Sequence, residues 1–99
     1  MTSLRHQYLV SYDIREPKRL RTVHKILDGY GDATQYSVFF CNLSPAERLQ
    51  LEFALVKVIN NKDDSILMID LGPAITKRDR RIHTLGTVQL PEIRKYLIV

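Results

Sequence analysis

The fold is decided by one stretch near the N-terminus, HQYLVSYDI at residues 6–14, which runs directly into REPKRL at residues 15–20. Aromatic and β-branched residues dominate the first segment, which predicts a β-strand. Strand alternation divides its side chains between two faces, with Tyr8, Val10, Tyr12 and Ile14 on one and Leu9, Ser11 and Asp13 on the other. The strand therefore delivers an aspartate to its end, immediately before the next element.

That next element is predicted to be a helix. Glu16 and Pro17 open it, because proline is tolerated at the first helical position. Its apolar residues recur at helical spacing, and Gly31 ends the run. They are Leu20, Val23, Ile26, Leu27 and Tyr30.

The remaining elements follow in order. A strand is expected at 34–41, and Ser44 and Glu47 form the capping box of a helix that reaches about residue 59. The nearly continuous apolar run at 65–71 is typical of a central strand covered on both faces. A last strand is expected at 80–88, before a tail that ends in an apolar segment.

We interpret this order as an α+β, ferredoxin-like βαββαβ sandwich with an extra C-terminal strand. Residues 1–99 form a single domain, in which 82–99 supply the last strand and a tail that crosses to a partner. Right-handed crossovers favour an antiparallel sheet ordered 4-1-3-2 with both helices on one face. The other face is expected to carry Leu9, Phe39 and Cys41, and covering it calls for a homodimer.

Positive charge is concentrated in two runs. The chain has a net charge of +4 and a pI near 9.4. Clustered cations are expected on a phosphate-binding face, although each run taken alone also fits a solvated surface. The first run holds Arg15, Lys18, Arg19, Arg21 and Lys25, and the second holds Lys77, Arg78, Arg80 and Arg81. We expect both runs to meet Asp13 at the same edge of the sheet and to bind nucleic acid.

Several classes of protein are excluded. A single cysteine, Cys41, permits neither an internal disulfide nor a thiolate metal site. No apolar run approaches the roughly 18 residues of a membrane span, so we expect no membrane partner and a cytoplasmic location.

Asp13 is the strongest candidate for chemistry. A carboxylate at the end of an apolar strand is costly unless it is paired, hydrogen-bonded or metal-bound. It could simply cap the next turn or pair with Arg15, or it could hold Mg²⁺ together with its symmetry mate. Adjacent Asp63 and Asp64 are more typical of solvated surface than of a supporting role. Tyr12 and Phe39 could stack on bases but more often belong to a core or interface.

The chain resembles the CRISPR-associated Cas2 family over nearly its whole length. The motifs that carry the resemblance are YLVSYDI (8–14), RLRTVHKIL (19–27), QYSVFFCNLS (35–44), DDSILMIDLG (63–72) and HTLG (83–86). The resemblance implies a homodimer, a CRISPR integrase partner, and an endonuclease that uses Mg²⁺ or Mn²⁺ on RNA or double-stranded DNA. It also implies that Asp13 is the metal ligand and catalytic residue. Arg19, Arg21 and Phe39 match positions that the family uses near this site.

Two functions therefore compete. One is a metal-dependent phosphodiesterase acting in CRISPR spacer acquisition. The other is a non-catalytic dimer that clamps DNA for the integrase, because one carboxylate per subunit and no evident general base make a sparse active site. An RNA-recognition module of the same topology is a weaker third reading, since its sheet face would have to remain free.

Overall fold

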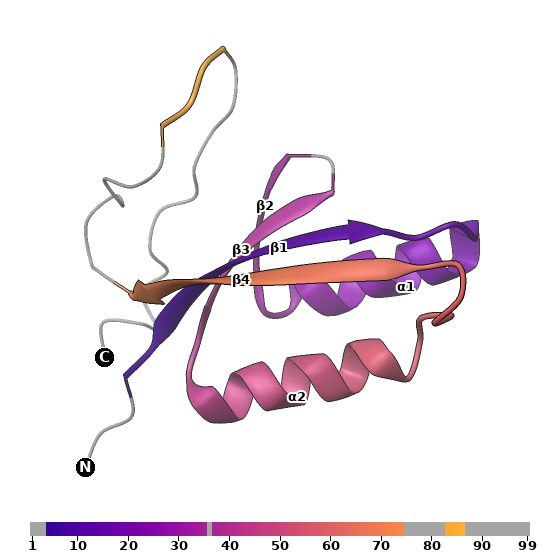
Figure 1. The fold of residues 1–99 in the computed structure, drawn as a ribbon, viewed down its shortest axis with the longest axis horizontal. Coiled ribbons are helices and arrows are strands. Elements are labelled where there is room, and N and C mark those ends of the chain that lie inside the picture. The colour runs from indigo at the N-terminus through magenta and orange to yellow at the C-terminus, as the bar shows by residue number, and fades with distance from the viewer. Residues whose placement is uncertain (1–3, 36, 75–82, 87–99) are drawn as a thin grey trace.

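The computed structural model describes residues 4–35, 37–74 and 83–86. Its elements are β1 (His6–Asp13), α1 (Pro17–Asp28), β2 (Gly31–Gln35), β3 (Val38–Leu43), α2 (Pro45–Val56) and β4 (Ser65–Pro73). The strands pair antiparallel in the order β2-β3-β1-β4, and both helices lie against one face of the sheet (Figure 1). The βαββαβ fold and the 4-1-3-2 sheet are confirmed, but the elements expected along the chain stood in another order, namely strand, helix, strand, helix, strand and strand.

Two of the strands in this sheet are formed by other segments, or lie at other positions, than the sequence predicted. Residues 34–41 are not one strand, because the chain turns at Ser37 and forms the β2–β3 hairpin. The apolar run at 65–71 belongs to β4, which pairs with β1 at the edge of the described sheet rather than at its centre. Of the strand expected at 80–88, residues 83–86 lie in no strand, and the others lie outside the described residues.

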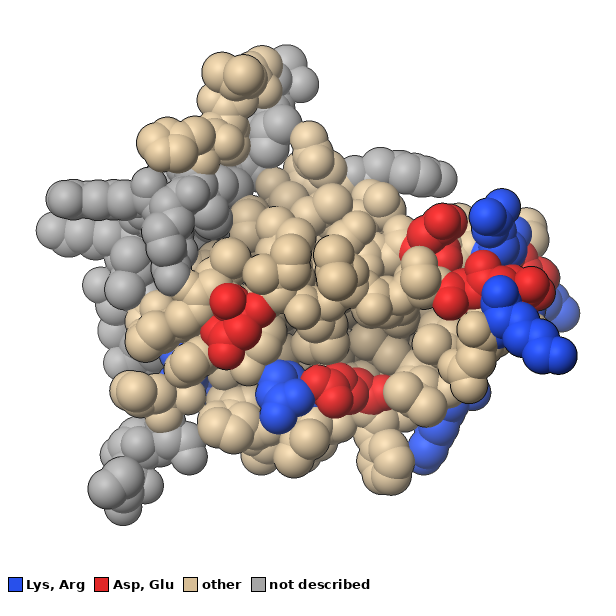
Figure 2. Space-filling view, in the orientation of Figure 1, with Lys and Arg blue, Asp and Glu red and all other residues tan. Residues whose placement is uncertain are grey.

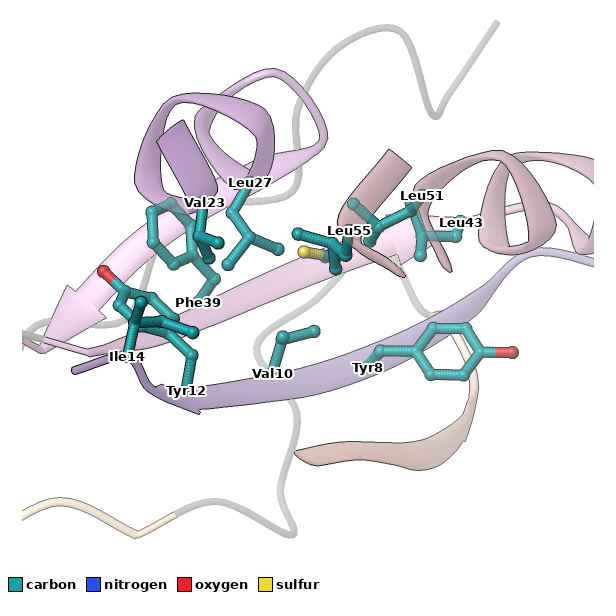
Figure 3. Packing of buried hydrophobic residues seen from close by; sticks show 11 residues of the cluster. Tyr8, Val10, Tyr12, Ile14, Val23, Leu27, Phe39, Leu43, Leu51 and Leu55 are labelled. Atoms are coloured by element: carbon teal, nitrogen blue, oxygen red, sulfur yellow. The ribbon is translucent and has the colours of Figure 1, made fainter. Parts of the chain in front are cut away.

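The hydrophobic core lies between the helices and the sheet. Tyr8, Val10 and Tyr12 of β1 are buried and point toward the helices, as the alternation predicted (Figure 3). The cluster is completed by Ile14, Val23, Leu27, Phe39, Cys41, Leu43, Leu51 and Leu55. Phe39 and Cys41 are fully buried in this cluster, so their assignment to the opposite face was wrong. The hairpin shifts the phase of β3 so that these two residues lie on the same face as Val10.

The opposite side of the sheet, which we call the open face, carries rows of apolar residues. Leu9 lies between Phe40 and Ile69, and directly opposed residues in a sheet share a face. Leu67, in the next row, is 57% exposed and Ile69 is 41% exposed. None of the described helices covers this face (Figure 1). The open face thus keeps the apolar character that was expected of a homodimer interface.

Capping residues in the sequence determine where both helices begin. Glu16 caps α1 by accepting a hydrogen bond from the Arg19 amide at 2.8 Å, and Pro17 follows. The predicted capping box of α2 is present: Ser44 Oγ accepts from the Glu47 amide at 3.1 Å, and Glu47 Oε1 accepts from the Ser44 amide at 2.9 Å. No described helix is long and apolar enough to cross a membrane.

Candidate nucleic-acid site at the end of the sheet

One end of the sheet brings together the segments that the sequence singled out. Here β1 ends at Asp13, α1 begins at Pro17 and β4 begins at Ser65, which lies directly opposite Asp13. We call this edge, formed by residues 13–18 and 60–65, the rim. Figure 2 shows that charged side chains of both signs gather there, at the right end of the view. The predicted meeting of the β1 end, the α1 start and the Asp63–Asp64 turn is therefore confirmed.

Asp13 is exposed on the open face of the rim. Neither simple role considered for it is present. The N-cap of α1 is Glu16, and the Arg15 amide donates its hydrogen bond to Asp64. In the part of the chain that the structure describes, no hydrogen bond or ion pair engages the Asp13 carboxylate. The carboxylate is therefore available to a ligand.

Asp64, rather than Asp13, is the buried carboxylate of the rim. Its residue exposure is only 8%. Its oxygens accept hydrogen bonds from the Arg15 amide at 3.0 Å, the Asn60 amide at 2.8 Å and the Arg19 Nε at 2.7 Å. The Arg19 guanidinium, followed by the two amides, holds the pKa of the Asp64 carboxyl far below its usual range, against the opposing effect of burial. Asp64 thus binds the β1–α1 turn to the turn that precedes β4.

Arg19 has a structural contact that the sequence did not predict. Its guanidinium uses Nε and Nη2 for Asp64, at 2.7 and 3.3 Å, and the hydrogen bond to Asp64 raises the pKa of the guanidinium above its usual value. A carboxylate already neutralises this cation, so its attraction for phosphate is reduced. In this structure Arg19 positions the rim.

The other cations of the first run are oriented toward solvent. Arg15, Lys18 and Arg21 are exposed. Exposed Asp13 and Asp63 lie on the same rim, so the described part of it carries both signs of charge. The second run, Lys77, Arg78, Arg80 and Arg81, lies outside the described residues. Its convergence with the first run stays a prediction.

The aromatic candidates lie in the core. Phe39 is fully buried, with its ring centroid 6.2 Å from that of Tyr12 and 5.2 Å from that of His24. Tyr12 is 6% exposed, and its hydroxyl lies 3.0 Å from His24 Nδ1. In this arrangement Tyr12 and Phe39 pack the base of α1 onto the sheet and offer no exposed ring for base stacking.

The side chains present at the rim are compatible with the few protein ligands that Mg²⁺ takes. Within residues 4–35, 37–74 and 83–86, no three His, Cys, Asp or Glu side chains are grouped as a metal site. One exposed carboxylate per chain nevertheless fits Mg²⁺, which retains several waters and takes only one or two carboxylates from the protein. Asp13 is the residue that would hold the ion, and a second copy of the chain would supply its partner.

The sequence reading missed the importance of Asp64. Two adjacent aspartates in a turn have the same appearance in a sequence, whereas in the structure Asp63 is exposed and Asp64 is buried. The only usable signal was position. Asp64 immediately precedes an apolar strand, and four residues earlier Asn60 supplies an amide to it.

Comparison with known proteins identifies the family. A family model described as CRISPR associated protein Cas2 matches residues 6–79. The chain is 44% identical over 81 residues to CRISPR-associated endoribonuclease Cas2 1 of Rhodospirillum rubrum, covering 82% of this chain and 78% of the relative. It is 35% identical over 96 residues to CRISPR-associated endoribonuclease Cas2 of Geobacter sulfurreducens, covering 97% of this chain and all of the relative.

Solved structures agree with this assignment. The crystal structure of Streptococcus pyogenes Cas2 at pH 6.5 superposes with a TM-score of 0.70 and 39% identity, covering 81% of this chain and 99% of that one. A structure titled as a hypothetical protein from Thermus thermophilus gives 0.73 at 26% identity, covering 89% and 99% of the two chains. The motifs of β1, the hairpin and β4, the sheet order and these similarities lead to one conclusion: the chain belongs to the Cas2 family.

Proposed function

We propose that this chain is a metal-dependent endonuclease of the CRISPR adaptation system, acting as a homodimer in the prokaryotic cytoplasm. The observation that carries the proposal is the exposed and unengaged Asp13 carboxylate on a rim that the Asp64 contacts hold in place. Relatives of the chain are named endoribonucleases, which favours RNA as the substrate, with double-stranded DNA as the alternative.

Each residue of the site has a separate role in the proposed reaction. Asp13 holds Mg²⁺ or Mn²⁺, and two copies paired through the open face bring two such carboxylates together. Arg15 and Lys18, both exposed beside Asp13, attract the phosphodiester backbone. When bound, the ion supplies a water of lowered pKa and neutralises charge on the phosphate. Asp64 and Arg19 keep the rim rigid enough for this geometry to be reproducible.

Asp13→Asn tests the catalytic role, because the amide keeps the shape and loses the charge. We expect cleavage of a labelled RNA in Mg²⁺ to fall by at least about 100-fold, with binding retained. The matched control is Asp63→Asn, an exposed aspartate on the same rim, which should cut like wild type. Cleavage by Asp13→Asn at the wild-type rate would show that the metal assignment is wrong.

One observation favours a second candidate, a non-catalytic scaffold that holds nucleic acid for the CRISPR integrase. The described rim offers two exposed carboxylates, Asp13 and Asp63, but no histidine among its residues: His24 Nδ1 bonds to Tyr12, and His6 pairs with Asp70 at 2.8 Å. If Asp13→Asn and wild type both fail to cleave while both bind a duplex, the scaffold is the function.

Salt dependence tests the binding surface under either function. Removing two phosphate contacts with Arg15→Ala and Lys18→Ala should reduce the slope of log K against log salt by about 1.8 on duplex DNA. Arg78→Ala with Arg81→Ala should do the same if the second run joins the first. An unchanged slope would show that the two mutated residues do not contact the phosphate backbone.

A further inference from the structure

The solvent side of α2 carries an apolar stripe that the fold does not use. Leu49, Phe53 and Val56 are 59%, 71% and 61% exposed. Their spacing of four and three residues places them on one side of the helix. Leu51 and Leu55, fully or almost fully buried, form the core contacts of the same helix. Helix α2 is therefore apolar on two sides, and folding of this chain requires only one of them. We call Leu49, Phe53 and Val56 the outer stripe.

The margin of the outer stripe is cationic. The Lys57 Nζ lies 5.3 Å from the centroid of the Phe53 ring, so its ammonium covers the edge of the stripe. No carboxylate within the described residues forms an ion pair with Lys57. The neighbouring helix α1, which contacts α2, also exposes Lys18, Arg21 and Lys25 at helical spacing, and the exposed Asp28 follows on the same side. An apolar stripe bordered by the Lys57 ammonium is complementary to an apolar and acidic ligand.

We propose that the outer surface of the helical layer docks an acidic amphipathic helix of a partner protein, with apolar side chains on the outer stripe and carboxylates against Lys57 and Lys25. The stripe spans eight residues of α2, from Leu49 to Val56, or about 10 Å, which matches two turns of a bound helix. Three side chains that protrude from one helix form the kind of anchor cluster that dominates helix recognition.

Nucleic acid and membrane lipid fit this surface less well. A phosphodiester backbone has positive charge to meet but no apolar groups to cover Leu49 and Val56. An anionic membrane would also approach Glu52, whose side chain is 42% exposed beside the stripe and pairs with Arg48. A peptide with carboxylates on one side only can cover the stripe and avoid Glu52.

The proposed docking surface lies on the helical layer (Figure 1). Asp13 is exposed on the opposite side of the sheet, the open face. A partner on α2 and a nucleic acid at the rim can therefore bind at the same time. The proposal does not depend on cleavage by Asp13, and its test uses residues outside the nucleic-acid surface.

A synthetic helical peptide of about 14 residues is the probe, with leucines repeated at intervals of four and three and glutamates on one flank. Fluorescence anisotropy with the full chain should give a Kd of about 10–100 µM. Peptides in which lysines replace the glutamates, or serines replace the leucines, should bind at least about tenfold more weakly. Absence of binding at about 1 mM, or equal binding of the serine peptide, would overturn the proposal.

Variants of the chain locate the peptide. Phe53→Ser should weaken binding by about tenfold, and Lys57→Glu should weaken the acidic peptide while strengthening the lysine peptide. Leu67→Ser is the matched control, because Leu67 is as exposed as Leu49 but lies on the open face. Circular dichroism confirms that each variant is folded. Equal weakening by Leu67→Ser, or sedimentation of wild type but not Phe53→Ser with anionic phosphatidylglycerol vesicles, would contradict a helix-binding surface.

Discussion

The Nε atom of Arg19 lies 2.7 Å from Oδ2 of Asp64, although 45 positions separate the two residues in the chain. The Asp64 side chain is inaccessible to solvent, and that of Arg19 is 26% exposed. The pair joins the turn after β1 to the turn before β4, the two segments that flank Asp13 and Ser65. The geometry around Asp13 therefore depends on a contact that does not involve Asp13 itself.

Replacing Asp64 should destabilise the fold. Asp64→Ala removes the acceptor of the Arg15 and Asn60 amides and leaves the Arg19 guanidinium without its counter-ion. We expect the midpoint of thermal unfolding to fall by roughly 10 °C. Asp63→Ala is the control, because Asp63 is exposed and should shift the midpoint by no more than about 2 °C. Equal shifts for the two variants would contradict the role given to Asp64.

The same contacts should make the protein sensitive to acid. The Asp64 pKa in the folded state is depressed below its unfolded value near 3.8, so below that value the unfolded state binds more protons. The stabilisation is complete above about pH 5 and is lost as the pH falls toward the folded pKa. Backbone hydrogen bonds also lower the pKa values of Glu16 and Asp70, which adds to the loss in the same direction.

Urea unfolding between about pH 2 and pH 6 measures this dependence. Asp64→Asn should be less stable at neutral pH and should show a flatter decline in acid than wild type. A variant that declines as steeply as wild type would assign the acid sensitivity to other carboxyl groups.

Two neighbouring glycines should differ in how much stability is lost when each is replaced by alanine. A Cβ on Gly31 would meet the Phe40 carbonyl and lie 2.5 Å from Cys41 Sγ, in a place fixed by the pairing of β2 with β3. We expect Gly31→Ala to lower the free energy of unfolding by about 3 kcal/mol. Gly29, at the C-cap of α1, has helical angles and only ordinary contacts, so Gly29→Ala should change it by no more than about 1 kcal/mol. Comparable losses would show that the hairpin can shift to make room.

Charge on the open face should separate the proposed dimer. Leu67→Lys with Ile69→Lys places two cations in adjacent apolar rows of β4, and both side chains already reach solvent in the single chain. We expect light scattering to give a dimer mass for wild type and a monomer mass for this variant, with unchanged circular dichroism. Leu49→Lys, on α2, controls for added charge and should remain dimeric. A monomeric wild type would remove the basis for sharing an ion between two Asp13 carboxylates.

The sequence was sufficient wherever a local rule acted alone. Strand alternation placed Tyr8, Val10 and Tyr12 on the buried face, and the Ser44–Glu47 pair marked the start of α2. The end of β1 at Asp13 followed from the helix start at Pro17. Each of these signals arises from a few neighbouring residues, so no knowledge of the tertiary structure was needed.

The hairpin and the place of β4 depended on contacts that no local rule describes. The turn at Ser37 lacks the glycine or asparagine that marks most tight hairpins, so 34–41 read as one strand. Phe39 and Phe40 are equally apolar, and without the turn their faces could not be told apart. A continuous apolar run such as that of β4 fits either a central strand or an edge strand whose outer face is covered by another subunit.

The sheet order also dictates when β1 can become complete during synthesis on the ribosome. Both neighbours of β1 in the sheet, β3 and β4, come later in the chain, and β4 begins 52 residues after β1 ends at Asp13. Until residues 65–73 have been translated, one edge of this apolar strand lacks its hydrogen-bonding partner. A nascent chain stalled after α2 would therefore expose a template for aggregation, and chaperone capture at that stage would protect the first strand rather than the last.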